Sequence, residues 1–599
     1  MSTSTPAPIT IDSTTLYAAV DGRMASLGTD EAVLFHDGRS QVMTRDVAHA
    51  FGMCRAFLPM PAHVQRIMDA MPTLKGQGAA VQRVLQVLAG QGLMQTGAQF
   101  IARFTPNDET RQAPISGVFV AASAKAGEFQ VMLDALVAHA ERFPLAWPVY
   151  VIEGAVDAAG EVEHAQAVAE FVRNSGIKAV HLTRARIENL IGTISSALPS
   201  HGNVLRWLLT PVSGSTGAAR NLAALLAAGT RMVFLDADTT LPILGHPQAA
   251  EGVFADARAM AVQTFDGPDS VRAAGAMLKV DPLQAHLDAC GVSLAQAMAR
   301  EPDATLKPES LQGVVPVRAA WLKPDNRVAF TALGWAGHVP ARDPNWVFKL
   351  DPAARAGLTA TRETYLDNYR IPSAWVGPSR FGIGQAHQLQ PLAFDVSQIL
   401  PCTLPDAPRA MELQIALSRL AHPDSTDLAF PQAAMQVRRT GVRNDALGRP
   451  DLAQCVAGLA DVVAQDVYAT EPALHLALLA AKLEDLAAAP DVRLTEYLAE
   501  FFAYHRSTAI EQMQRAMAAD KSPPIYWLAD LRSAVEAQGK ALIAGEVPRL
   551  DGWPENLDAA TCVARLRGSL QEFAVGLRAW PSAFDVARQH SAQWRARLS

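Results

Sequence analysis

The chain has 599 residues, of which 49% are hydrophobic and 19% charged, and its formal net charge is −7 at pH 7 with the histidines neutral. A chain of this length and composition buries more than one core, so we expect two to four domains. It contains no long basic run, which excludes the electrostatic footprint of a general nucleic-acid binder.

The cysteines and the N-terminus indicate a reducing compartment. The five cysteines are scattered without a CxxC pair, so we interpret them as free thiols rather than as a disulfide framework or a zinc site. Residues 1–12 lack the basic and apolar segments of a signal peptide and are expected to form a disordered tail. Leu222–Leu235 and Ala473–Leu483 fall short of the roughly 20 apolar residues of a membrane span. We expect a cytoplasmic protein.

Residues 13–105 have the pattern of a small α/β module. A strand is expected around Ala32–Phe35, followed by a turn at Asp37-Gly38 and by helices that end near Met94. This order resembles the small winged-helix peptide-binding modules found beside peptide-modifying enzymes. The resemblance implies a role in peptide recognition.

From Pro114 the apolar pattern alternates between strands and helices. Strands are expected at Ile115–Ala122 and Val149–Ile152, with a helix at Glu128–Phe143 between them. A helix at Ala218–Ala228 then precedes a buried strand at Arg231–Leu235. This alternation predicts a mainly parallel sheet whose ligand lies at the carboxyl ends of the strands.

Alanine- and leucine-rich helical patterns dominate the last part of the chain, for example at Ala473–Ala488 and Val492–Met517. They contain no catalytic motif that we recognise. We therefore expect an α/β nucleotide-binding domain at residues 112–438 and an α-helical C-terminal domain at residues 439–599. A helical domain of this size is typical of self-association, which suggests a homodimer.

Two carboxylates follow the strand at Arg231–Leu235. Side-chain alternation places Asp236 and Asp238 near one edge of the sheet, while Ala237 points away. Mg²⁺ and Mn²⁺ ions shared with substrate phosphates prefer one or two carboxylate ligands, so both aspartates are candidate metal ligands. Such an ion would offset the charge on a leaving diphosphate. The alternative is a solvated loop, because Asp-x-Asp sequences are common.

The segment before these aspartates contains a second motif. The helix that begins with Gly217–Asn221 leads through a turn and a strand to Asp236 and Asp238. This arrangement resembles the core of the family 2 glycosyltransferases, where a Gly/Ala-Arg-Asn helix precedes the aspartate motif at this spacing. The resemblance implies a GT-A (Rossmann-like) fold in which Arg220, Asn221 and Asp236 lie close to a nucleotide sugar. Alternatively, Arg220 and Asn221 are a polar pair at a helix N-terminus.

The same resemblance assigns the nucleotide to the first two strands. Ser123 and Lys125 occupy the turn after the first strand, where family members usually have Thr and Arg. Ser123 is therefore expected to contact the nucleotide, and Lys125 is either a phosphate contact or an ordinary surface lysine. Glu153 keeps the acidic residue that contacts the base or ribose after the second strand.

A second stretch, from Leu392 to Pro431, resembles the acceptor-side half of some bacterial family 2 glycosyltransferases. In these relatives an acidic pair at a helix start supplies the catalytic base, and here the pair is reduced to Glu412. Glu412 is the candidate base and Asp406 the alternative. Glu412 also has a purely structural interpretation, in which it pairs with Arg409 one helical turn earlier.

Family members often complete the metal site with a later histidine. The candidates are His338 and His387, although neither lies in a matching motif. Trp335, Trp346 and Trp375 have the right chemistry to stack on a sugar or a base, but core packing is the more common role of tryptophan.

Together these features predict a metal-dependent inverting glycosyltransferase that uses Mn²⁺ or Mg²⁺ and a nucleotide-diphosphate sugar, with UDP-sugar favoured by the resemblance. The N-terminal module and the missing membrane anchor suggest a peptide or protein acceptor. A small metabolite or a surface polysaccharide is the alternative acceptor. Two other functions are a non-catalytic nucleotide-sugar or peptide-binding protein that has lost its base, and a nucleotidyltransferase, which the lack of a glycine-rich phosphate loop disfavours.

Overall fold

The computed structural model of the chain describes most of its residues, in stretches separated by gaps. The described residues are 14–106, 111–122, 126–154, 157–212, 215–236, 239–255, 261–314, 322–338, 356–357, 359–370, 373–384, 389–407, 409–436, 450–519, 524–545, 549–554 and 556–598. Ser123, Lys125, Asp238, Trp346 and His387 therefore lie outside the described residues.

The N-terminal part combines two small antiparallel sheets with helices around one core. Its strands are β1 (Leu16–Ala19), β2 (Arg23–Leu27), β3 (Glu31–His36), β4 (Arg39–Thr44), β5 (Leu58–Pro59) and β6 (Met94–Thr96). Its helices are α1 (Arg45–Met53), α2 (Met60–Ala70), α3 (Gly78–Gly90) and α4 (Gly97–Ile101). The predicted turn between β3 and β4 is present, with Asp37 and Gly38 both at positive φ. Strands β2, β3 and β4 form a meander in which β4 is an edge strand.

The centre of the molecule is a mixed sheet. Its first strands are β7 (Ile115–Ala121), β8 (Val149–Ile152), β9 (Ala179–Leu182) and β10 (Arg231–Leu235). Its later strands are β11 (Thr239–Gly245), β12 (Val253–Phe254), β13 (Ala261–Thr264), β14 (Ala276–Met277), β15 (Arg327–His338), β16 (Ser373–Gly377), β17 (Phe381–Ile383), β18 (Gln390–Asp395) and β19 (Ser425–Gln436). The main path runs β12-β17-β19-β15-β18-β10-β7-β8-β9.

The sequence predicts the first half of this sheet correctly and the second half incorrectly. Strands β10, β7, β8 and β9 are parallel neighbours, as the strand and helix alternation predicts. Beyond β10, however, β18 is antiparallel to both β10 and β15. The expectation of a mainly parallel sheet is therefore wrong for this half, although β15 and β19 within it are parallel. The antiparallel neighbours β10 and β18 are far apart in the sequence, and no periodicity in either strand specifies their relative direction.

Helices cover both faces of the parallel half. They are α5 (Ala126–Arg142), α6 (Ala158–Ser175), α7 (Arg184–Ala197), α8 (Gly202–Leu209) and α9 (Gly217–Leu226). Alternate residues of each strand enter different cores: Phe119 and Phe234 pack with α7, α8 and α9, whereas Val118 and Val233 pack with α5 and α6. Strands that are apolar at every position are buried on both faces, which explains their continuous hydrophobic runs.

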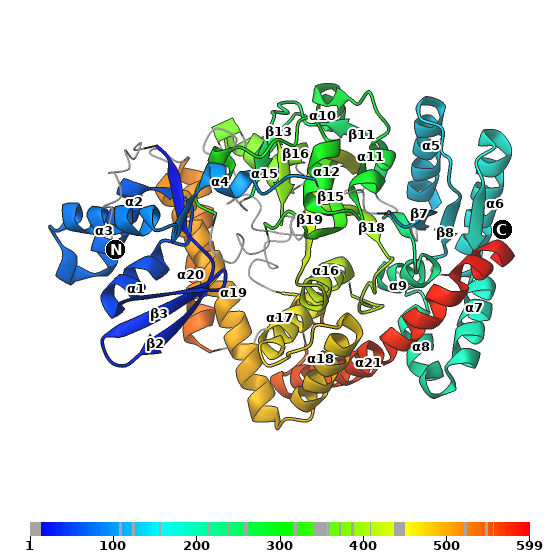
Figure 1. The fold of residues 1–599 in the computed structure, drawn as a ribbon. Helices are drawn as coiled ribbons and strands as arrows, with labels where there is room; N and C mark the ends of the chain where they lie inside the picture. Colours follow the sequence, from blue (N-terminus) through cyan, green and yellow to red (C-terminus); the bar gives the residue numbers. More distant parts are fainter. Residues whose placement is uncertain are drawn as a thin grey trace.

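The remaining helices lie later in the chain. They are α10 (Pro268–Ala274), α11 (Pro282–Ala289), α12 (Leu294–Arg300), α15 (Arg362–Arg370), α16 (Ala410–Ala421), α17 (Leu452–Ala464), α18 (Pro472–Ala487), α19 (Asp491–Ala519), α20 (Ile525–Ile543) and α21 (Ala559–Leu598). Helix α21, red in Figure 1, runs past α18 and along α8 and α9 to the end of the molecule opposite the N-terminal part.

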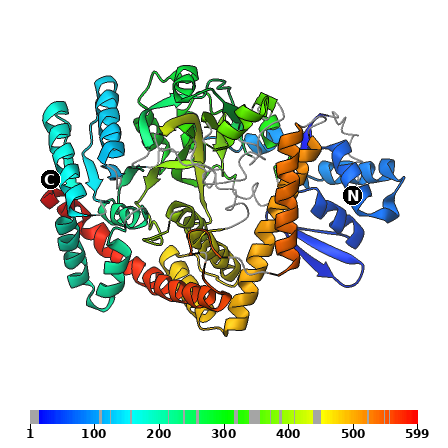
Figure 2. The same ribbon diagram turned by 180° about the vertical axis from the view of Figure 1, so that it is seen from behind.

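The C-terminal helices share a core with the sheet. Trp580 and Phe584 of α21 belong to the same buried cluster as Phe119 of β7 and Leu222 of α9. Figure 2 shows from behind how α21 crosses the helices of the parallel half. No helix within the described ranges is long and apolar enough to cross a membrane. The predicted boundaries between domains remain a prediction.

Candidate functional site

The strand order reverses at one point of the parallel half, and the crevice expected there is the candidate site. From β7 the chain adds β8 and β9 on one side and then returns to place β10 on the other side of β7. The carboxyl ends of β7 and β10 are therefore neighbours, and the chain continues from them to strands on opposite sides. In open α/β sheets, ligands bind in the crevice at such a switch point. Asp236 is the first residue after β10 and Ala122 the first after β7.

Asp236 forms a buried ion pair with Arg220 at this edge. Nη2 of Arg220 donates to both carboxylate oxygens, at 3.1 Å to Oδ1 and 3.0 Å to Oδ2. The side chains are 2% and 5% exposed, and the Arg220 guanidinium carbon lies 4.3 Å from the centroid of the Phe234 ring. Arg220 comes from α9, and its guanidinium contacts both Phe234 and Asp236. These contacts hold the end of β10 against the first turn of α9.

Asn221, the next residue of α9, binds protein backbone rather than the crevice. Its amide nitrogen donates to the carbonyl oxygens of Leu208 and Thr403 at 3.0 and 2.9 Å, and its oxygen accepts from the Thr403 amide at 2.9 Å. It is fully buried. The structure therefore gives Asn221 the role of joining α9 to the segment before α16, and its contact with a nucleotide sugar stays a prediction.

The segment around Asp406 packs closely against the start of α9. Ser215 donates from its hydroxyl to the carbonyl oxygens of Pro405 and Ala407, at 2.9 and 3.1 Å. Gly217 comes so close that an added Cβ would lie 2.0 Å from the carbonyl oxygen of Leu404. This approach explains the glycine of the motif, and it brings the exposed side chain of Asp406 to the same end of α9 as Arg220.

Glu412, in the first turn of α16, faces the start of α17. Its Oε2 accepts a hydrogen bond from Nε2 of Gln454 at 3.0 Å, and the residue is half-buried. Arg409 approaches Asp451, with 3.7 Å between Nε and Oδ2. Burial raises the pKa of the Asp451 carboxyl, and Arg409 opposes that shift. Sequence analysis missed Asp451 and Gln454 because they lie 42 residues beyond Arg409 and Glu412, respectively, in the sequence.

Glu153, after β8, lies between two histidines. Its Oε1 is 2.8 Å from Nδ1 of His164 on α6, and its Oε2 is 2.8 Å from Nε2 of His181 on β9. Glu153 and His164 are almost completely buried. Both carboxylate oxygens are thus engaged within the protein, so the predicted contact with a base or ribose would have to share them. Nothing in the local sequence pairs these residues, which are 11 and 28 positions apart.

The other predicted ligands contribute less to the crevice. His338 ends β15 and is half-buried. Trp335 and Trp375 are 6% and 0% exposed on the neighbouring strands β15 and β16, where they belong to the protein core. The five cysteines are all free, as predicted, and all five are buried.

The described residues do not by themselves fit a metal ion. Across those residues there is no group of three or more His, Cys, Asp and Glu side chains able to hold one. Both oxygens of Asp236 already accept hydrogen bonds from the Arg220 cation. The predicted Mn²⁺ or Mg²⁺ site therefore depends on Asp238, which lies outside the described residues.

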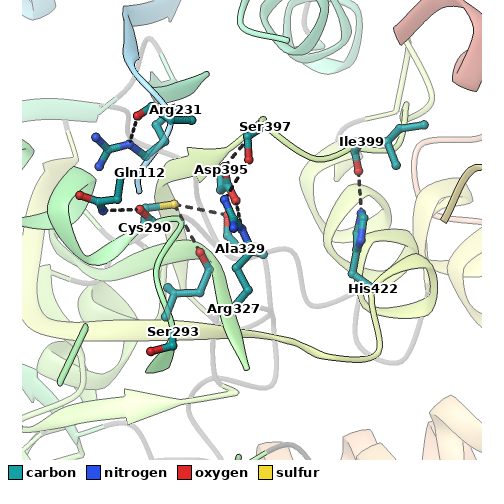
Figure 3. A network of polar contacts seen from close by, with 12 residues as sticks. Gln112, Arg231, Cys290, Ser293, Arg327, Ala329, Asp395, Ser397, Ile399 and His422 are labelled. Atoms are coloured by element: carbon teal, nitrogen blue, oxygen red, sulfur yellow. Dashed lines mark hydrogen bonds and ion pairs between the residues drawn. The ribbon is translucent and has the colours of Figure 1, made fainter. Parts of the chain in front are cut away.

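A second polar network lies at the opposite, amino end of β10 (Figure 3). Arg327 forms an ion pair with the buried Asp395 and donates to the Ser397 hydroxyl at 2.9 Å. Arg231 donates from Nε to the Ala113 carbonyl at 2.8 Å. Burial raises the pKa of the nearby Cys290 thiol well above its usual range, which makes it a poor nucleophile. This network holds strands and loops together and presents no reactive group.

Comparison with protein-family models, with curated proteins and with solved structures finds no match for this chain. The function is therefore inferred from the residues of the site.

We expect Arg220→Met to lower the free energy of unfolding by about 3–5 kcal/mol, because Asp236 keeps a buried charge after its cation is removed. The double variant Arg220→Met/Asp236→Asn should recover most of this loss. Urea denaturation followed by circular dichroism measures both. Arg206→Met, in the exposed pair with Glu188, is the matched control and should cost less than about 1 kcal/mol. An equal loss of unfolding free energy in Arg220→Met and Arg206→Met would contradict the role of the Arg220–Asp236 pair as a buried ion pair.

Proposed function

We propose that the chain is a glycosyltransferase that takes its sugar from a nucleotide-diphosphate donor bound at the carboxyl edge of β7, β8 and β10. The observation that supports this function best is the buried pair of Arg220 and Asp236 at the switch point of the parallel strands. It joins the two motifs on which the resemblance to family 2 glycosyltransferases rests, the Arg-Asn helix and the first aspartate after the strand.

The strand order supports one direction for the donor. In this proposal the nucleoside lies over the ends of β7 and β8, and the diphosphate lies at the end of β10. The transferred sugar then extends over β18 and β11. Arg220 acts as a positioning residue, because its guanidinium holds the Asp236 carboxylate at the edge of the sheet. UDP-sugar is the donor that the resemblance favours, and the predicted metal dependence rests on Asp238.

Asp406 is better placed than Glu412 to act as the base. A base must reach the acceptor hydroxyl or side chain, and Asp406 is exposed beside the start of α9. Glu412 is half-buried and accepts a hydrogen bond from Gln454. In the proposed inverting transfer, Asp406 removes the acceptor proton, the acceptor atom bonds to the anomeric carbon, and the bond from that carbon to the diphosphate oxygen breaks.

The N-terminal part supports a peptide acceptor. Strand β4 has largely exposed side chains and one edge that pairs with no other strand of the described residues. Beside it a groove of about 340 Å³ is lined by Val42 of β4 and by Val84, Val87 and Arg83 of α3. An extended peptide gains main-chain hydrogen bonds when it adds to an open sheet edge, and alternate side chains fit such a groove. Arg83 favours acidic residues at the positions facing it.

We expect Asp236→Asn to weaken binding of UDP-sugars at least about tenfold, because hydrogen bonds to a charged group contribute about 1.5–3 kcal/mol. Isothermal titration with UDP, UDP-glucose, UDP-galactose and UDP-N-acetylglucosamine, with and without Mn²⁺, measures this. Asp395→Asn removes a buried carboxylate at the other end of β10 and should leave binding unchanged. No binding of any of these nucleotides to the unmodified chain would refute the proposed function.

Asp406→Asn should lower the rate of UDP release from the donor by about 10²- to 10⁴-fold, which is the usual contribution of a general base. Binding of the donor should stay unchanged, because Asp406 acts on the acceptor. Glu412→Gln is the matched control, with an expected change of less than about tenfold. If the rate falls in Glu412→Gln instead, Glu412 is the base. UDP release without sugar transfer in every condition would favour a donor hydrolase or a non-catalytic binding protein.

Val42→Asp and Val87→Asp should each abolish binding of an extended peptide with alternating Leu and Glu, because both place a carboxylate in the apolar groove. Fluorescence anisotropy of the labelled peptide measures binding, and a Leu and Lys peptide tests the role of Arg83. Val462→Asp is the control: Val462 is 47% exposed on α17, the same exposed fraction as Val42. Equal peptide binding by all three variants would rule out the groove.

A further inference from the structure

Two buried glutamine amides meet at one hydroxyl beside the candidate site. Gln390 begins β18, Gln436 ends β19 and Thr239 begins β11. The amide nitrogens of the two glutamines lie 2.6 and 3.2 Å from Oγ1 of Thr239. The three residues are 1%, 3% and 1% exposed, in that order. Their side chains therefore form a fixed polar cluster inside the protein.

The amide oxygens of both glutamines lack a hydrogen-bond partner. Oε1 of Gln390 and Oε1 of Gln436 are buried and accept no hydrogen bond from the residues that the structure describes. Each oxygen is bonded to the same carbon as the nitrogen that reaches Thr239, so both oxygens stay close to that hydroxyl. Most buried acceptors in native proteins are satisfied, and leaving one unsatisfied is costly. Two such oxygens in one cluster are candidate acceptors for a donor from outside the chain.

The strand register places this cluster next to Asp236. Val233 of β10 pairs with Ala393 of β18, and continuing this antiparallel register by three residues puts Gln390 opposite Asp236. Gln436 pairs with Thr239, three residues after Asp236. The cluster thus lies at the same edge of the sheet as the ion pair, but on the side of β10 away from β7 and β8.

We propose that the oxygens of Gln390 and Gln436 accept hydrogen bonds from hydroxyl groups of the transferred sugar and thereby select the donor. This inference rests on the proposed function, in which the sugar extends from Asp236 toward β18 and β11. Sugar hydroxyls are hydrogen-bond donors and match two neutral acceptors. The phosphate groups of the donor offer only acceptor oxygens, so they cannot satisfy these amides. Thr239 is the positioning residue, because it engages both amide nitrogens.

The test compares the sugar with the bare nucleotide in glutamine variants. Gln390→Met and Gln436→Met keep side-chain length and remove the acceptor oxygens. Isothermal titration with UDP and with UDP-glucose, UDP-galactose and UDP-N-acetylglucosamine gives the affinity that the sugar adds. We expect each variant to bind the tightest UDP-sugar about three- to tenfold more weakly, which is the contribution of one hydrogen bond. Binding of UDP alone should be unchanged.

Gln432→Met is the matched control. Gln432 lies on the same strand β19, is buried, and also has an unsatisfied Oε1, but it pairs with Gly245 at the far end of β11. The Gln432→Met variant should bind UDP and UDP-sugars with the affinity of the unmodified chain. Equal weakening of UDP and UDP-sugar in Gln390→Met and Gln436→Met would overturn the inference, as would unchanged affinity for the sugar in both.

A second measurement needs no variant and so does not depend on folding. Deoxy analogues of the tightest UDP-sugar, each lacking one hydroxyl, are titrated into the unmodified chain. At least one should bind about three- to tenfold more weakly than the parent sugar. If all analogues bind like the parent, sugar recognition by the amides is wrong while a nucleotide site remains. If neither UDP nor any UDP-sugar binds, the proposed function fails and this inference fails with it.

Discussion

The ion pair between Arg220 and Asp236 connects the parts of the candidate site. An arginine on a helix and an aspartate after a strand are both withdrawn from water, and each charge is tolerated because the other is 3.0 Å away. Through this pair the end of β10 is fixed to α9. Through Asn221 and Ser215, the same helix is fixed to the segment that contains Asp406. The positions of the donor edge and of the proposed base thus depend on one short helix.

Strand β10 is held by charged groups at both of its ends. Arg220 and Asp236 lie at the carboxyl end, while Arg231 lies at the amino end, close to the ion pair of Arg327 and Asp395. Between them the strand is buried on both faces. The two ends differ in what surrounds them: the amino end is bonded to backbone and hydroxyl groups, whereas the carboxyl end lies beside a switch point and two amide oxygens that have no donor among the described residues. This asymmetry is the reason for proposing the donor site at the carboxyl end.

Local patterns predict the elements well and their long-range partners poorly. The strands at Val149–Ile152 and Arg231–Leu235 have the predicted bounds because short continuous apolar runs are typical of strands buried on both faces. Gly217 and Arg220 of α9 are also recognisable from the local sequence, because they belong to one short motif before Asp236. The partners of Glu153, Glu412 and Thr239 come from distant elements, and no periodicity encodes such pairings. The antiparallel pairing of β18 with β10 and β15 was likewise not predictable, because the sequence of a strand does not specify its neighbours.

Helix α9 itself rests on the last helix of the chain. Ser591 donates to the carbonyl oxygen of Ala228 at 2.9 Å, and Arg595 donates to that of Leu226. Both carbonyl oxygens belong to the end of α9 and the turn that leads into β10. During synthesis on a ribosome, the sheet strands emerge long before these residues, and domains usually fold as soon as their own segments are available. Here the helix that positions Asp236 lacks its outer support until α21 has been translated. The edge proposed to bind the nucleotide should therefore be completed only after Ser591 and Arg595 have emerged from the ribosome, long after β10 itself.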